Sequence, residues 1–232
     1  MVKKTVQKEV KITTHHSGVQ NMEWVFQFWA WQLLFWSVYR YFFHLPETVD
    51  EFIVKPLVFV LPVLLYVWKK EKRSLTSIGI TGKHIWTSLG IGCGFGLLFA
   101  GEAVIANILK YGGLTIQPSA TVVQYGIPLM FALSLATACS EELLSRGFFF
   151  SRLFEISHNL VNAVVMSTFL FVAFHIPILL TSLRFQGTTL VLFFMTSFVL
   201  GFANSIIYHK TKSLVAPILI HFFWNMTVAV FL

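Results

Sequence analysis

The sequence predicts an all-α membrane protein, a polytopic bundle of about seven transmembrane helices (six to eight). Of its 232 residues, 56% are hydrophobic and only 12% are charged, about half the roughly 25% charged residues of a soluble domain. A mean hydropathy of +0.73 excludes a water-soluble single domain and a disordered chain. The apolar residues also fall in separate runs, most of them close to the roughly 20 residues that a helix needs to cross a bilayer.

Seven candidate spans follow from the apolar runs that charged residues, proline or glycine separate. They cover residues 24–43, 52–68, 85–109, 122–150, 160–180, 188–208 and 214–232. The second is short enough to be tilted, interrupted or partly interfacial. The chain shows no internal repeat and no long linker. We therefore expect a polar cytoplasmic tail over residues 1–22 and a single membrane domain over residues 23–232.

The positions of the basic residues predict the orientation of the bundle. Thirteen lysines and arginines fall in the N-terminal tail and after the second, fourth and sixth spans, whereas Arg40, Lys55, Lys110 and Arg184 fall on the other side. The positive-inside rule then places the N-terminus in the cytoplasm and the C-terminus outside, in an integral protein of the cell membrane. The basic residues form no stripe with interleaved aromatics, so we expect no nucleic-acid partner.

The third span is rich in glycine. Gly92 and Gly96 stand four residues apart and therefore lie on one face of a helix. No strand precedes them and the spacing is not that of a nucleotide-binding loop. Small residues at this spacing let two membrane helices approach closely, so we expect a packing role.

Strongly polar side chains interrupt three spans of the C-terminal half. A charged side chain at the centre of a span costs about 2.5–3.5 kcal/mol on the insertion scale, so each needs a reason. The polar side chains are Glu141, Glu142 and Arg146 in the fourth span, His175 in the fifth, and His221 and Asn225 in the seventh.

Helix geometry predicts which of these side chains act together. Glu142 and Arg146 are four residues apart, so they share a face and can neutralise each other. Glu141 lies about 100° around the helix and is left to point into the bundle. The Glu142–Arg146 pair would then fix the charge state and rotamer of Glu141. His221 and Asn225 also share a face, which presents two side-chain donors to one point.

Peptide hydrolysis needs an activated water, a group that stabilises the oxyanion and a proton for the leaving amine. We expect Glu141 to polarise the water and His175 to help orient it. Asn225, together with His221, would hydrogen-bond the developing oxyanion. Phe171, one turn before His175, would pack beneath the imidazole or line a substrate groove. No Gly-x-Ser-x-Gly elbow or Ser/His/Asp order competes with this assignment.

The depth of His175 is the one feature that strains this assignment. Glu141, His221 and Asn225 fall near the middle of their spans, whereas His175 lies nearer the end of its own and is followed by Pro177. On straight, upright helices the offset is about 10 Å. A tilted fifth span would close it.

The ordered motifs Glu-Glu-x-x-x-Arg, Phe-x-x-x-His and His-x-x-x-Asn on successive membrane helices resemble those of the CPBP family. This family contains the type II CAAX prenyl endopeptidases and bacterial proteins linked to bacteriocin self-immunity. The resemblance covers residues 122–232 as a catalytic core. It implies a glutamate-dependent intramembrane endopeptidase without a cofactor, whose partners are membrane lipids and a membrane-anchored or prenylated peptide substrate. The matching residues are Glu141, Glu142, Arg146, Phe171, His175, His221 and Asn225.

Three alternatives stay open. A zinc protease would use Glu142 (or Glu141), His175 and His221 as a His₂Glu site, although the sequence has no His-Glu-x-x-His motif. A proton-coupled transporter would use the same polar residues as a relay, although the chain lacks repeats and paired broken helices. A non-proteolytic membrane immunity or binding scaffold would keep the fold without needing the motif residues.

Overall fold

A computed structural model describes residues 2–116 and 118–231, with side chains described except at 2–21, 106, 110, 188 and 231. Every regular element in the described part of the chain is helical, which confirms the all-α prediction. The α-helices are α1 (Val2–Phe42), α2 (Glu47–Val49), α3 (Leu61–Leu65), α4 (Ile85–Tyr111), α5 (Ala120–Glu142), α6 (Ser151–Ser157), α7 (Leu160–Ala173), α8 (Ile176–Ile178), α9 (Gly187–Thr211) and α10 (Val215–Phe231). The π-helical segments Asp50–Val54, Pro56–Val60, Tyr66–Lys70, Leu143–Phe150 and Leu179–Leu183 extend or join several of them, and Leu75–Ile78 is a short 3₁₀ helix.

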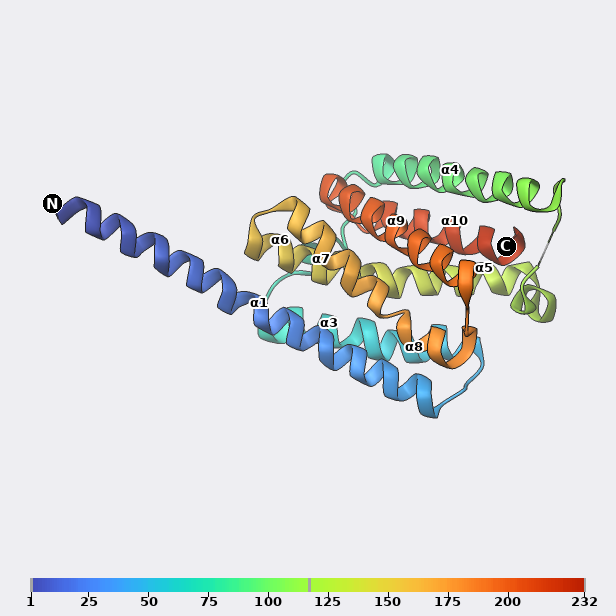
Figure 1. Ribbon diagram of the computed structural model, residues 1–232, viewed down its shortest axis with the longest axis horizontal. Helices are drawn as coiled ribbons and strands as arrows, with labels where there is room; N and C mark the ends of the chain where they lie inside the picture. Colours follow the sequence, from blue (N-terminus) through green and yellow to red (C-terminus); the bar gives the residue numbers. More distant parts are fainter. Residues whose placement is uncertain (1, 117, 232) are drawn as a thin grey trace.

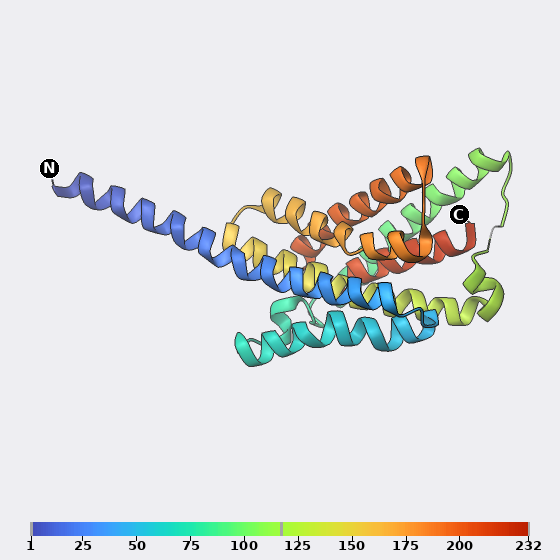
Figure 2. The ribbon, with the colours of Figure 1, turned by 60° about the horizontal axis from the view of Figure 1, so that its bottom comes forward.

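Five continuous helical segments of the described chain are long and apolar enough to cross a membrane. They are Glu47–Lys70, Ile85–Leu109, Ala120–Ser157, Leu160–Leu183 and Thr189–Thr211, and Val215–Val230 is a shorter apolar helix. The protein is therefore a multi-pass integral membrane protein. The first apolar run of the sequence lies in α1 and the last in α10, and both helices run alongside these segments (Figures 1 and 2).

Successive long helices run in opposite directions, so the two ends of the chain lie at opposite ends of the bundle (Figure 1). Helix α10 packs against α4, α5 and α9, and α7 packs against α9 and against the π-helical segment that follows α5. The backbone over residues 2–21 continues α1 away from the bundle. The polar tail predicted for residues 1–22 lies, apart from Met22, outside the residues whose side chains are described.

Glycines of α4 allow its close approach to α10, as the sequence predicts. A Cβ atom on Gly92 would stand 2.8 Å from the Cβ of Leu219, and one on Gly96 would overlap the ring of Phe223. Gly94, on the other side of the helix, has open space around it. The expected packing role of Gly92 and Gly96 is confirmed.

The second span is longer than the sequence suggests, because it begins at Glu47 instead of residue 52. Lys55, which the sequence places among the outer charges, is only 7% exposed and lies inside this segment. Its ammonium group forms ion pairs with Glu51 and Glu141, which offset the cost of burying the charge. Arg146, counted with the loop after the fourth span, is likewise buried within Ala120–Ser157.

The connections after the second, fourth and sixth spans meet at one end of the bundle. Arg152 in α6 pairs with Glu71 at 2.6 Å, and Arg73 pairs with Glu155 at 2.7 Å. Lys212, which follows α9, lies 5.3 Å from the ring centroid of Phe154. The three basic connections therefore lie together, as a positive-inside topology requires. Which side of the membrane they face stays a prediction.

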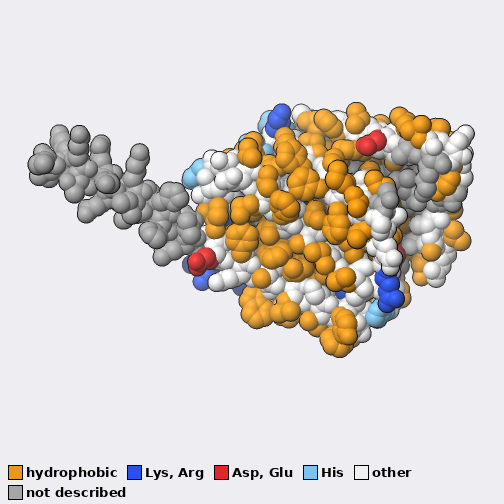
Figure 3. Space-filling view, in the orientation of Figure 1, with side chains coloured by type: hydrophobic (Ala, Val, Ile, Leu, Met, Phe, Trp, Pro, Cys, Tyr) orange, Lys and Arg blue, Asp and Glu red, His pale blue; other side chains and the backbone are white. Residues whose placement is uncertain are grey.

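The outer surface of the bundle is broadly apolar. Figure 3 shows a wide hydrophobic area with few charged side chains on the face that it presents. Large apolar side chains are exposed along the spans, including Trp86 at 82%, Leu109 at 79% and Leu180 at 73%. An apolar surface of this kind suits contact with lipid chains, in which the helical backbone keeps its hydrogen bonds internal.

Candidate active site

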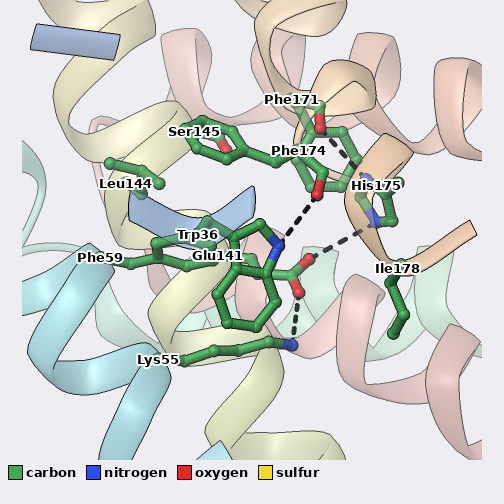
Figure 4. Close-up of a pocket in the computed structure, with 10 residues that line it drawn as sticks. All are labelled: Trp36, Lys55, Phe59, Glu141, Leu144, Ser145, Phe171, Phe174, His175 and Ile178. Atoms are coloured by element: carbon green, nitrogen blue, oxygen red, sulfur yellow. Dashed lines mark hydrogen bonds and ion pairs between the residues drawn. The ribbon is translucent and has the colours of Figure 1, made fainter. Parts of the chain in front are cut away.

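A cavity of about 60 Å³ lies inside the bundle (Figure 4). A cavity of this size is large enough to hold water. Side chains from α1, from the segment Glu47–Lys70, from α5 and its π-helical extension, and from the α7–α8 region line it. They are Trp36, Lys55, Phe59, Glu141, Leu144, Ser145, Phe171, Phe174, His175 and Ile178.

Glu141 and two histidines converge beside this cavity. The Oε2 atom of Glu141 lies 3.8 Å from Nε2 of His175 and 3.8 Å from Nε2 of His221. This oxygen is buried and accepts no hydrogen bond from the described residues. The structure thus brings together three residues that the sequence distributes over three separate spans.

The other nitrogen of each imidazole is already engaged. Nδ1 of His175 lies 3.1 Å from the carbonyl oxygen of Phe171, and Nδ1 of His221 lies 2.8 Å from Oε1 of Glu142. Because both partners are acceptors, each Nδ1 carries a proton and donates it. In the neutral form of either ring, Nε2 is therefore a hydrogen-bond acceptor facing Glu141.

Glu142 is fully buried and is not among the described residues that line the cavity. Its Oε1 atom accepts hydrogen bonds from Arg146 Nη1 at 3.0 Å, Asn204 Nδ2 at 3.0 Å and His221 Nδ1 at 2.8 Å. The predicted Glu142–Arg146 pair is confirmed. The adjacent carboxylates have different surroundings, because Glu142 holds a neighbouring imidazole whereas Glu141 faces the cavity.

Phe171 joins the supporting pair to both histidines. The guanidinium carbon of Arg146 lies 4.3 Å from the centroid of the Phe171 ring, in a cation–π contact. The same ring meets His175 edge to face, with 4.8 Å between centroids, and His221 at 6.0 Å. Phe171 also lines the cavity. Its predicted contact with the imidazole of His175 is present, and its role in a substrate groove stays a prediction.

The end of α7 places His175 level with Glu141, and the expected offset in depth is absent. Pro177 has no N–H to donate to the backbone oxygen four residues earlier, and α7 ends at Ala173. Trp36 of α1 then donates its indole N–H to the carbonyl oxygen of Phe174 at 3.2 Å. The break and this cross-helix bond hold the imidazole against the cavity.

Lys55 is a member of the site that the sequence analysis missed. Its Nζ atom lies 2.8 Å from Oε1 of Glu141 and 2.8 Å from Oε1 of Glu51 (Figure 4 shows the first contact). Thr137 of α5 donates to Oε2 of Glu51 at 2.6 Å. The sequence did hold one signal that could have predicted this role, because Glu51 and Lys55 form an i,i+4 pair at the start of an apolar run. Asn204, the other missed residue, is a lone amide in the apolar sequence of α9.

Asn225 lies one helical turn beyond His221 on α10 and is half-buried. Among the described side chains, those that line the cavity do not include it. Its expected role beside His221 therefore remains a prediction.

The residue types around the cavity would also suit a zinc site, so the fit of a metal needs a test. The described residues contain no group of three His, Cys, Asp or Glu side chains that could hold a metal ion. Of the expected set Glu142, His175 and His221, Glu142 already accepts three hydrogen bonds at Oε1, one of them from His221. These three side chains do not share a coordination point.

The fold and the cluster of Glu141 with two histidines define the class of this protein. It is a helical intramembrane protein with a buried carboxylate–histidine site. Residues 123–227 match the model of the family described as type II CAAX prenyl endopeptidase, Rce1-like. The match spans all seven motif residues and confirms the resemblance noted from the sequence. Over this region the chain is therefore similar to a CAAX-type intramembrane protease family. The comparisons with curated proteins and with solved structures give no match.

Proposed function

We propose that this protein is a glutamate-dependent intramembrane endopeptidase that hydrolyses peptide bonds of membrane-anchored or prenylated (CAAX-type) proteins. The observation that carries the proposal is the convergence of Glu141 Oε2 with Nε2 of His175 and of His221 beside an internal cavity. A carboxylate and an imidazole nitrogen that both accept hydrogen bonds can hold and polarise one water between them.

In the first step, a water held between Glu141 and His175 attacks the carbonyl carbon of the scissile bond. The water gives one proton to Glu141 as its oxygen forms the new C–O bond. The electrons of the C=O bond move onto the carbonyl oxygen, which becomes an oxyanion. The side chains of Glu141 and His221 are at most 12% exposed, and electrostatic contacts are stronger in such low-dielectric surroundings.

His221 is the proposed donor to the oxyanion. As an imidazolium it donates from Nδ1 to Glu142, at 2.8 Å, and from Nε2 to the substrate oxygen. The flanking carboxylates of Glu141 and Glu142 offset its charge. The amide of Asn225 is the second donor. Loss of one such donor typically costs about 10²–10³ in kcat.

In the last step, the tetrahedral intermediate collapses and the C–N bond breaks. Glu141 returns its proton to the leaving nitrogen, so the products are a carboxylic acid and an amine, between which the remaining water proton then passes to give a carboxylate and an ammonium group. Glu141 is then ionised again. No step requires a cofactor.

The test uses purified protein in detergent with matched prenylated and unprenylated membrane-anchored peptides. We expect the parent to cleave, and Glu141→Gln and His175→Ala to lose at least about 10³ in kcat/KM. If both variants cleave as well as the parent, the mechanism is wrong. The non-proteolytic scaffold would be favoured by a different result. In that case the parent cleaves neither peptide, and the immunity or binding phenotype of cells that carry the protein survives both substitutions.

A further inference from the structure

The buried Glu51–Lys55–Glu141 ion triad (these three side chains) joins the N-terminal half of the chain to the candidate active site. The Lys55 side chain is 9% exposed, and those of Glu51 and Glu141 are 15% and 12% exposed. Glu51 and Lys55 lie outside residues 123–227, which match the family model. Glu51 and Lys55 therefore reach the site from a helical segment outside the matched region.

Lys55 is fixed in position from both sides. Its ammonium group meets Glu51 at 2.8 Å on its own helical segment and Glu141 at 2.8 Å on α5. Glu51 is held in turn by the hydroxyl of Thr137, also on α5, at 2.6 Å. A buried charge with two such partners loses much of its freedom to move, because leaving either carboxylate would strand an uncompensated charge.

The consequence for Glu141 is a fixed orientation of its carboxylate, whose two oxygens are chemically equivalent. The terminal torsion of a glutamate side chain is broad, so a free carboxylate would turn through many orientations. Lys55 engages Oε1, and Oε2 is the oxygen that lies 3.8 Å from both imidazoles. Figure 4 shows this division, with Lys55 and His175 on opposite oxygens of Glu141.

We propose that Lys55 is a positioning residue that holds Glu141 by Oε1, so that Oε2 meets the reacting water, and that Glu51 acts through Lys55. The inference rests on the proposed function and adds a residue that lies outside the family motifs. Lys55 itself forms no bond to the substrate. It fixes the geometry and balances the charge of Glu141, which exchanges a proton with the water and the leaving nitrogen.

A second buried ion pair, between α1 and the same segment, provides a matched control. Arg40 pairs with Asp50 at 2.5 Å, and both side chains are at most 10% exposed. Asp50 is adjacent to Glu51 in the chain, yet neither Arg40 nor Asp50 lines the cavity. Asp50→Asn therefore removes a buried ion pair of the same helix without touching Glu141.

The experiment compares Lys55→Met, Lys55→Arg, Glu51→Gln, the Glu51→Gln/Lys55→Met double variant and Asp50→Asn, all purified in detergent. We expect Lys55→Met to lower kcat about 100-fold with KM within about threefold, since a small misplacement of a reacting group costs about that much. Lys55→Arg keeps the charge and should recover part of the loss. Glu51→Gln should lower kcat about tenfold alone and not at all in the Lys55→Met background, because coupled residues are not additive. Asp50→Asn should keep the parent kcat even where its melting temperature falls.

The outcomes separate this inference from the proposed function. A Lys55→Met variant with the parent kcat, beside an inactive Glu141→Gln variant, would overturn the role of Lys55 and leave the function standing. An active Glu141→Gln variant would overturn the function itself. If Lys55→Met does not accumulate as a folded protein, Glu51→Gln carries the test. A fall in its kcat at constant KM supports the inference, and a parent kcat overturns it.

Discussion

The Nδ1 atom of His221 lies 2.8 Å from Oε1 of Glu142, while Nε2 of the same ring faces Glu141. One imidazole thus connects two glutamates that are adjacent in the sequence and differ in surroundings. Oε1 of Glu142 accepts three hydrogen bonds, whereas Oε2 of each glutamate accepts none from the described residues. Of the two carboxylates, Glu141 lines the cavity and Glu142 pairs with Arg146. We therefore expect a reactive role for Glu141 and a structural role for Glu142.

Glutamine substitutions should separate these two roles. Glu142→Gln removes the carboxylate that neutralises Arg146, and breaking a buried ion pair in this way costs about 3–5 kcal/mol. Glu141→Gln leaves Lys55 paired with Glu51, so the loss of stability should be smaller. We expect Glu142→Gln to melt well below the parent, and Glu141→Gln to melt nearer the parent while losing activity. Thermal unfolding in detergent, read beside peptide cleavage, measures both. An inactive, unstable Glu141→Gln beside a stable, active Glu142→Gln would contradict the assignment.

The sequence was sufficient to predict the features that depend on local pattern. Hydropathy located the helices, and i,i+4 spacing gave the Glu142–Arg146 pair and the close approach at Gly92 and Gly96. The contact of Lys55 with Glu141 joins residues 86 positions apart, and no local pattern encodes it. Because Lys55 stands at the edge of an apolar run, the sequence analysis placed it in a loop outside the membrane.

The depth of His175 shows the same limit. A proline and two cross-helix tryptophan bonds set where α7 ends, since Trp29 and Trp36 of α1 donate to carbonyl oxygens of Leu170 and Phe174. The depth estimate from the sequence assumed a straight, upright helix and therefore left out this break. It placed the imidazole too far from Glu141.

Two glycines of α4 give a matched test of helix packing. In Gly96→Ala the new methyl would overlap the Phe223 ring, whereas in Gly94→Ala it would enter open space. Overpacking of this kind typically costs about 1–3 kcal/mol, and alanine favours a helix over glycine by up to about 1 kcal/mol. We expect Gly96→Ala to lower the melting temperature and Gly94→Ala to leave it unchanged or raise it. Equal melting temperatures would contradict the close contact between α4 and α10.

Removal of metal should leave the activity intact. The proposed mechanism uses Glu141 and His175 to activate water without a metal ion, whereas the zinc alternative needs Glu142, His175 and His221 as ligands. We expect the purified protein to keep its cleavage rate after dialysis against a strong chelator, with elemental analysis reporting the zinc content. Loss of activity that added zinc restores would favour the zinc protease instead.

The orientation in the membrane is tested by cysteine labelling. In a background without Cys93 and Cys139, single cysteines would replace Lys83, before α4, and Gln186, before α9. Both positions are exposed and lie in connections on opposite sides of the predicted topology. A membrane-impermeant maleimide should label Gln186→Cys in intact cells and Lys83→Cys only after permeabilisation. The reverse pattern would place the N-terminus outside and the cavity in the opposite orientation.

Two asparagines on neighbouring helices distinguish support from catalysis. Asn204 is buried and donates to Glu142 at 3.0 Å and to the carbonyl oxygen of Pro217 at 3.2 Å. Asn204→Ala leaves these buried acceptors short of a donor, which costs about 1–3 kcal/mol, so its melting temperature should fall. Asn225 is half-buried, one turn beyond His221, and its proposed amide donor serves only the oxyanion. Asn225→Ala should therefore keep the parent melting temperature and KM while kcat falls about 10²–10³-fold. A stable Asn225→Ala with the parent kcat would remove Asn225 from the oxyanion site and leave His221 as its only proposed donor.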